Sequence, residues 1–318
     1  MATANSHRSV LQQELNYSMP TWNEVNQEIE QSKAANSCDV IRKKYLNILE
    51  GKVERTVIAY YSGWLQKRSP DGRTHPEAAI TDLDMNGFMA VVHNVDRTRG
   101  LDLVLHTPGG GTEATRALVE YLYKMFGSDI RVIVPHMAMS AGTMIACASK
   151  EIIMGKHSSL GPTDPQVKGH PAMGVLAEVE RAILEIKKEP VKQFVYQQVF
   201  GKYPPAFVLD CERQVQGSAE MVERWLRENM LSGQPDPSSA AKMAREGLMD
   251  YEGTTEHAHH FMIDKCRELG LNVTGLEDDQ ELQEDVLSVH HAFIASFAHT
   301  NALKIIENGS GLNWVVTN

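Results

Sequence analysis

Residues 101–134 read LDLVLHTPGGGTEATRALVEYLYKMFGSDIRVIV, and this stretch decides the fold. Two short apolar runs, at residues 101–105 and 130–134, have the length of buried strands. Between them, apolar residues recur at helical spacing from Ala114 to Met125. A strand, a helix and a second strand in this order predict two parallel strands joined by a crossover helix. We therefore expect an α/β core.

The alternation continues on both sides of this stretch. Further strands are expected at residues 56–64 and 151–154, and further helices at residues 85–95 and 140–148. Beyond Pro171 the chain turns helical, with a late helix predicted at residues 259–269.

The two ends of the chain differ from the middle. Residues 1–52 are polar with sparse apolar positions and predict an N-terminal helical extension, with two helices meeting near Asn36. Residues 276–318 begin with the acidic run LEDDQELQED and predict an acidic helical C-terminal tail. Residues 53–275 remain for the α/β core, which is long enough to bury a sizeable interior.

Composition excludes several classes of protein. The chain has 31 Lys and Arg against 41 Asp and Glu, a net charge of −10, which argues against a nucleic-acid binder. Its four cysteines form no CxxC pair and fit buried thiols in a reducing compartment better than disulfides or a zinc site. No signal peptide or membrane-spanning segment is evident. We expect a soluble, cytoplasmic protein without a bound metal.

Two loops follow predicted parallel strands, where ligand sites of open α/β sheets gather. In the first, Gly109, Gly110 and Gly111 expose backbone N–H groups that can bind an anion or an oxyanion, although a simple tight turn explains them as well. In the second, Ser140 opens a helix and is followed by the small residue Ala141. Ser140 could merely cap this helix, but two such loops on successive strands favour a functional site.

The motif HTPGGG at residues 106–111, followed by MSAGTMIACASKEIIMGKHSSLGPTDPQ at residues 139–166, resembles the serine dehydrogenase proteinase family. This family belongs to the Clp protease/crotonase superfamily and is related to signal peptide peptidase A. The likeness extends over roughly residues 56–275. It implies a Clp/crotonase-like core of parallel strands with crossover helices, here with flanking helices at both ends. It also implies a serine endopeptidase that needs no cofactor and assembles as a homo-oligomer.

The resemblance assigns roles to five residues. Ser140 would be the nucleophile, and the backbone N–H groups of Gly110 and Ala141 would form the oxyanion hole. Asp164, between two prolines, would orient the base. Aligning the family's histidine-containing turn with this chain makes His259 the base.

The identity of the base stays open. His257 and His260 are near neighbours of His259, and His260 stands where the family usually has Asp. Signal peptide peptidases use a lysine instead, for which Lys168, Lys187, Lys188 and Lys192 are available. His106 and His136 lie close to the two loops in sequence and are spare candidates, whereas the pair His290–His291 is expected on the surface.

Three other functions are compatible with these residues. The histidines near residue 257 could bind a metal, but no HExxH or Cys/His spacing supports this. In acyl-CoA enzymes of the crotonase type, the two N–H donors would hold a thioester enolate and no serine would be needed. A degenerate core serving as an assembly scaffold is a third alternative. We expect a protease acting on peptides or proteins.

Overall fold

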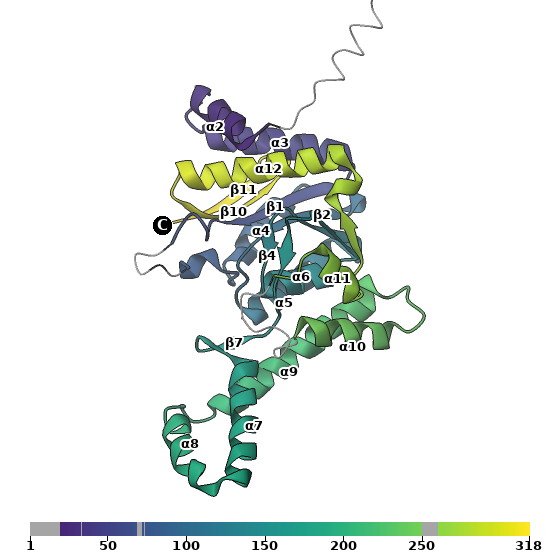
Figure 1. The fold of residues 1–318 in the computed structure, drawn as a ribbon. Coiled ribbons are helices and arrows are strands. Elements are labelled where there is room, and N and C mark those ends of the chain that lie inside the picture. The colour runs from purple at the N-terminus through teal and green to yellow at the C-terminus, as the bar shows by residue number, and fades with distance from the viewer. Residues whose placement is uncertain (1–19, 33, 69–71, 73, 250–259) are drawn as a thin grey trace, which may run out of the picture.

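A computed structural model of the chain describes residues 20–32, 34–68, 72, 74–249 and 260–318. Within these residues, the centre of the fold is a mixed sheet of seven strands in the order β11-β10-β1-β2-β3-β5-β9 (Figure 1). Five neighbouring strands of this sheet are parallel: β1 (Thr56–Ser62), β2 (Leu101–His106), β3 (Ile130–Val134), β5 (Glu151–Met154) and β9 (Val273–Gly275). The α/β core is confirmed, with its four predicted strands as β1, β2, β3 and β5.

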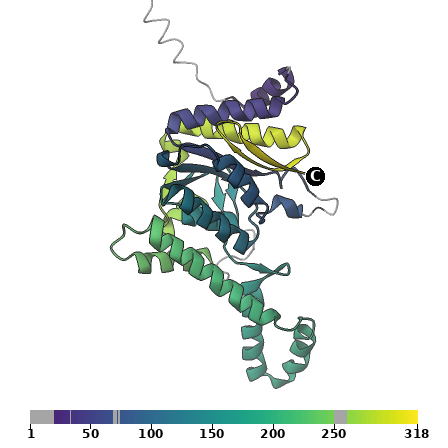
Figure 2. The ribbon, with the colours of Figure 1, turned by 180° about the vertical axis from the view of Figure 1, so that it is seen from behind.

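Helices cover both faces of the sheet (Figures 1 and 2). One layer consists of α2 (Trp22–Gln31), α3 (Ser37–Val53) and α12 (Gln280–His299), and the other of α4 (Asp84–Val92), α5 (Thr112–Phe126) and α6 (Ala141–Ala148). In β1, Val57, Ala59 and Tyr61 pack into the first layer. Ile58 and Tyr60 pack into the second. Because both faces of β1 and β2 are buried, apolar residues occupy both faces of these strands.

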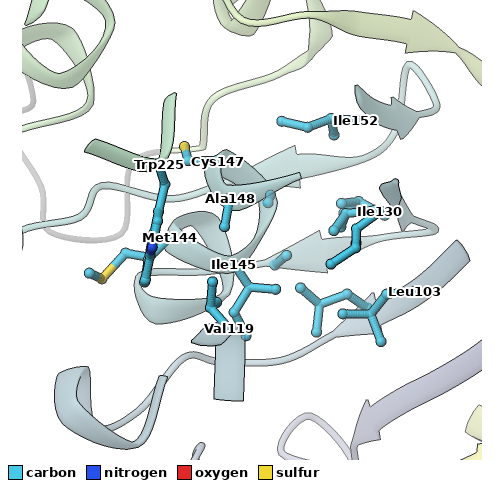
Figure 3. Close-up of a cluster of buried hydrophobic side chains, with 14 of the residues drawn as sticks. Leu103, Val119, Ile130, Met144, Ile145, Cys147, Ala148, Ile152 and Trp225 are labelled. Carbon is cyan, nitrogen blue, oxygen red and sulfur yellow. The ribbon is translucent and has the colours of Figure 1, made fainter. Parts of the chain in front are cut away.

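Helix α6, which follows Ser140, is anchored in the core. All of its residues, Ala141–Ala148, are buried. Figure 3 shows Trp225, from the end of α9 (Phe207–Trp225), beside Met144 in a cluster that also includes Ile145 and Cys147. The start of α6 is therefore held by close packing, and with it the position of Ser140.

The prediction of a helical C-terminal tail is wrong beyond His299. After α12, the chain forms β10 (Ala302–Asn308), antiparallel to β1, and β11 (Asn313–Thr317), antiparallel to β10. Every residue of β10 is buried. Ile305 packs with the layer of α3 and α12, and Ile306 packs with the opposite layer. Successive residues point to opposite faces in an extended strand, so a strand buries both side chains. The C-terminal segment thus completes the central sheet.

A helical arm projects away from the sheet (Figures 1 and 2). The short hairpin of β7 (Gln166–Val167) and β8 (His170–Pro171) leads into α7 (Ala172–Lys188), α8 (Gln193–Phe200) and α9. The helix predicted beyond Pro171 is confirmed as α7. Large apolar side chains are exposed on the arm and its tip: Ile183, Leu184, Val191, Phe194 and Val195.

Two helices bring the chain back to the sheet before β9. They are α10 (Pro237–Leu248) and α11 (Ile263–Glu268). The helix predicted at residues 259–269 is shorter than expected, since it begins at Ile263, and His260 precedes it. No helix among the described residues is both long and apolar enough to span a membrane.

Candidate active site

The glycine loop begins where β2 ends. Gly109 has a φ of +95°, a conformation that residues with a side chain rarely adopt. A Cβ atom at Gly109 would lie 2.6 Å from the carbonyl oxygen of Met139 and 2.8 Å from Cβ of Ser140. Glycine is therefore required here by its conformation and by the approach of the Ser140 turn.

Ser140 lies between the short strand β4 (Met137–Ala138) and α6. Its φ of +51° and ψ of −113° lie outside the regions usual for residues other than glycine. Ser140 occupies the N-cap position of α6, but its side chain makes no capping hydrogen bond. The interpretation of Ser140 as a simple helix cap is therefore wrong. Strained backbone of this kind, where the packed surroundings enforce it, is concentrated at active sites.

Backbone hydrogen bonds join the two loops. The N–H of Thr107 donates to the carbonyl of Met137 (3.1 Å), and the N–H of Met139 donates to the carbonyl of Thr107 (3.0 Å). The N–H groups of Gly110 and Ala141 donate no hydrogen bond to any residue that the structure describes. Two backbone donors close to Ser140 are thus left for a ligand.

A third segment holds the far side of the glycine loop. We call this segment, residues 79–81, the strap. The N–H of Ile80 donates to the carbonyl of Gly109 (2.8 Å), and the N–H of Gly111 donates to the carbonyl of Ile80 (2.9 Å). A Cβ atom at Gly110 would lie 2.3 Å from both the nitrogen and the oxygen of Ile80. The strap therefore fixes the plane of the peptide groups around Gly110.

These segments line a cavity of about 1280 Å³. Gly110, Ser140 and Met144 form part of its wall. On another part of the wall lie Lys168, from the turn between β7 and β8, and Arg213, from α9. The cavity is large enough for several residues of a peptide, since small-molecule sites usually occupy 300–1,000 Å³.

Asp164 lies behind this wall rather than on it. Its side chain is buried (3% exposed), and Oδ1 accepts a hydrogen bond from the N–H of Met173 in the first turn of α7 (3.1 Å). Its neighbours Thr163 and Pro165 line the cavity. The structure thus places Asp164 in the loop beside the cavity wall, where its side chain accepts a hydrogen bond from the start of α7.

The loop that carries Asp164 is tied to α6. It follows β6 (Ser159–Leu160), which pairs with β4. The hydroxyl of Thr143 in α6 accepts a hydrogen bond from the N–H of Gly161 (2.9 Å) and donates to the carbonyl of Ala138 (2.9 Å). Glycine at 161 also permits close approach, because a Cβ there would lie 3.2 Å from the nitrogen of Ser140.

The chain that follows the histidine residues returns to the same place from His260 onward. His257 and His259 lie outside the described residues. Phe261 exchanges two backbone hydrogen bonds with Leu160 in β6 (2.9 and 3.0 Å), next to Gly161. Nδ1 of His260 shares a hydrogen bond of 2.7 Å with Oγ of Ser159. The chain that follows His259 therefore lies beside the Ser140 turn, whereas the recorded partner of His260 is Ser159.

Lys192, one of the lysines considered as an alternative base, is placed elsewhere. It lies at the tip of the arm, between α7 and α8, and forms ion pairs with Glu185 and Glu189 (both 3.3 Å). It does not line the cavity. The position of Lys192 far from the cavity could not be predicted from the sequence, because the length and direction of the arm depend on its packing. Lys168 is the lysine that the fold brings to the cavity, and its φ of +52° marks a tight turn.

Part of the chain is similar to known proteins. Residues 80–202 match the family described as ClpP-like SDH-type serine proteinase. This part of the chain is therefore similar to that family. The matched segment contains the glycine loop, Ser140 and Asp164, and it ends before the histidine region. The Clp-like α/β fold class predicted from the sequence is confirmed.

Two proteins of Methanocaldococcus jannaschii are similar to part of the chain. Uncharacterized protein MJ0137 is 35% identical over 138 residues, covering 39% of this chain and 48% of the relative. Uncharacterized protein MJ1495 is 34% identical over 137 residues, covering 39% and 47%. The chain therefore spans about half the length of the curated relatives that it matches.

A cluster of histidine rings lies beneath the glycine loop. His106, the last residue of β2, has its ring centroid 5.5 Å from that of His136 and 5.4 Å from that of His290. His290 comes from α12, which lies outside the family match. The prediction that His290 is on the surface is wrong, because this face of α12 packs on the sheet. Among the described residues, no three His, Cys, Asp or Glu side chains are placed to hold a metal ion.

Burial makes these rings resist protonation. It lowers the pKa of His106 well below its ordinary value and that of His290 to about 3, and the neighbouring imidazoles add to both shifts. The pKa of His136 is lowered for the same reason. In the unfolded chain the histidines have a pKa of about 6.5, so below that pH the unfolded chain binds more protons than the folded protein. Acid therefore favours unfolding.

We expect the free energy of unfolding to fall as the pH decreases below about 6.5, by up to about 1.4 kcal/mol per pH unit for each ring. Urea denaturation between pH 8 and pH 5 measures this. His290→Gln should make the dependence shallower, whereas His299→Gln, at the exposed end of the same helix, should leave it unchanged. Equal slopes in all three proteins would contradict the role assigned to the cluster.

Proposed function

We propose that this chain is a serine peptidase in which Ser140 attacks the carbonyl carbon of a peptide bond. One observation carries the proposal: Ser140 is held at a φ of +51°, with its hydroxyl unused for capping, at the wall of a large cavity. The family match of residues 80–202 supports the same chemistry. A helix start next to two unengaged backbone N–H groups suits attack on a carbonyl.

In the proposed mechanism, the Ser140 Oγ–H bond breaks as Oγ bonds to the substrate carbonyl carbon, and the proton passes to the base. The carbonyl oxygen becomes an oxyanion, which the N–H groups of Gly110 and Ala141 stabilise. Each donor is worth about 3 kcal/mol. The base then protonates the leaving amine as the peptide bond breaks. Water hydrolyses the resulting ester and restores Ser140.

We assign the base to His259 and its orientation to Asp164. Support comes from the position of Phe261, two residues after His259, which pairs with Leu160 next to the Ser140 turn. Burial of Asp164 in the adjacent loop suits a carboxylate that orients an imidazole. Lys168 is the alternative base, in a Ser–Lys pair, because it lines the cavity.

We further propose that the substrates are peptides or proteins and that the chain forms a homo-oligomer through the arm. The apolar side chains exposed on α7 and α8, among them Leu184 and Phe194, have no covering element within the described chain. All four cysteines are free and buried, which suits a reducing, cytoplasmic environment.

Cleavage of a denatured, dye-labelled protein such as casein tests the proposed function. We expect turnover by the wild type and only background release by Ser140→Ala. Ser238→Ala, an exposed serine in α10, should cleave like the wild type. Wild-type turnover by Ser140→Ala, or no cleavage by the folded wild type, would count against the proposal.

The same assay identifies the base. His259→Ala should lose turnover, and His257→Ala, His260→Ala and Lys168→Met should keep it. Loss in one of those three, with His259→Ala active, would move the base to that residue.

A further inference from the structure

The sheet contains a buried ion pair outside the cavity. Nζ of Lys304, in β10, lies 2.6 Å from Oδ1 of Asp84, the first residue of α4. The two side chains are at most 1% exposed. Taking both charges out of water costs several kcal/mol per ion, and an apolar pair of similar size often stabilises a fold as well or better.

The hydrogen bonds of the pair converge on the strap. Besides Asp84, Nζ of Lys304 donates to the carbonyl of Ala79 (2.6 Å). Oδ2 of Asp84 accepts from the N–H of Thr81 (3.0 Å) and from the hydroxyl of Tyr60 in β1 (2.8 Å). The ion pair therefore fixes the peptide groups on both sides of Ile80, through the carbonyl of Ala79 and the N–H of Thr81.

Ile80 in turn fixes the glycine loop. Its N–H binds the carbonyl of Gly109, and its carbonyl binds the N–H of Gly111, so the two peptide groups flanking Gly110 are held from the strap. A continuous series of recorded hydrogen bonds thus runs from Lys304 through Ala79 and Ile80 to the loop. The N–H of Gly110, between these fixed points, is the proposed oxyanion donor.

We propose that Lys304 and Asp84 are positioning residues that hold the strap so that the N–H of Gly110 points at the oxyanion. This inference rests on the proposed function for its catalytic consequence. It gives the C-terminal strand β10, which lies outside the family match, a part in the active site. Directional hydrogen bonds to the Ala79 carbonyl and the Thr81 N–H explain why a charged pair, rather than an apolar one, lies here.

The chain offers a matched control on the same strand. Nε of Arg42, in α3, lies 2.6 Å from Oε2 of Glu307, and both side chains are buried. Glu307 lies three residues after Lys304 and on the opposite face of β10. This second ion pair has no recorded contact with the strap.

The experiment compares Lys304→Met/Asp84→Asn with Arg42→Met/Glu307→Gln. Each double variant removes both charges, so no buried charge is left unpaired. Hydrogen exchange is followed in peptides covering residues 76–84 and 107–114, together with the rate at which a fluorophosphonate modifies Ser140. Tm is measured for both variants.

In Lys304→Met/Asp84→Asn, we expect the hydrogen-exchange rate of both peptides to rise at least tenfold. We also expect fluorophosphonate labelling of Ser140 to slow by about 10- to 100-fold, because small misplacements of catalytic groups have effects of this size. Arg42→Met/Glu307→Gln should change neither, even with a similar loss in Tm. Equal effects of the two variants, or none in the first, would overturn the inference. If the wild type is not labelled, the proposed function fails, while hydrogen exchange still tests the positioning.

Discussion

Gly110→Ala is expected to lower the rate of acyl transfer at Ser140 by about 10²- to 10³-fold, the usual cost of losing one oxyanion donor. The added Cβ would lie 2.3 Å from the nitrogen and the oxygen of Ile80, which are backbone atoms of the strap. Backbone cannot give way as the end of a flexible side chain can. The loop must therefore move away from the strap, and the Gly110 N–H moves with it.

Gly111→Ala is the matched control for this prediction. A Cβ at Gly111 would have its nearest contact at 3.6 Å, to the oxygen of Ile80, which is ordinary van der Waals distance. The φ of Gly111 is −66°, a value that alanine adopts readily. Second-order rates of fluorophosphonate labelling compare the two variants with the wild type. Similar rates for Gly110→Ala and Gly111→Ala would show that Gly110 is not a donor to the oxyanion.

Trp225→Ala is expected to lower the free energy of unfolding by about 3–5 kcal/mol, the range for removing a fully buried aromatic side chain. Trp225 is 2% exposed and packs in the cluster that holds α6 (Figure 3). The cavity left behind would also loosen the base of α6, at whose start Ser140 lies. The proposed peptidase activity should therefore fall along with stability.

Urea denaturation measures this loss. Trp314→Ala serves as the control because Trp314, on the edge strand β11, is 37% exposed and buries less area. Its loss should be clearly smaller than that of Trp225→Ala. Losses of equal size would contradict the account of α6 as a helix fixed by core packing.

The strands and loops nearest the site follow from the sequence because their signals are local. Residues 101–134 contain a buried strand, a glycine turn, an amphipathic helix and a second strand, and each forms as expected. Gly109 and Ser140 meet because both loops leave the same edge of a parallel sheet.

Other features depend on contacts between distant residues, which no local pattern reveals. The run ALKIIEN at residues 302–308 is too short for periodicity to separate a buried strand from a helix, and pairing with β1 decides in favour of the strand. The burial of Lys304 follows from that sheet, and the enclosure of the His290 ring among other rings follows from α12 lying across it. The φ of Ser140 is imposed by the surrounding loops, and its residue type gives no sign of it.

The central claim is that Ser140 is an activated nucleophile. Its most direct test is to treat the folded wild type with a fluorophosphonate, digest it and locate the adduct by mass spectrometry. We predict a single stoichiometric adduct on Ser140 and none in Ser140→Ala. A folded protein that remains unmodified, or one that carries the adduct at another residue and keeps it in Ser140→Ala, would contradict the account.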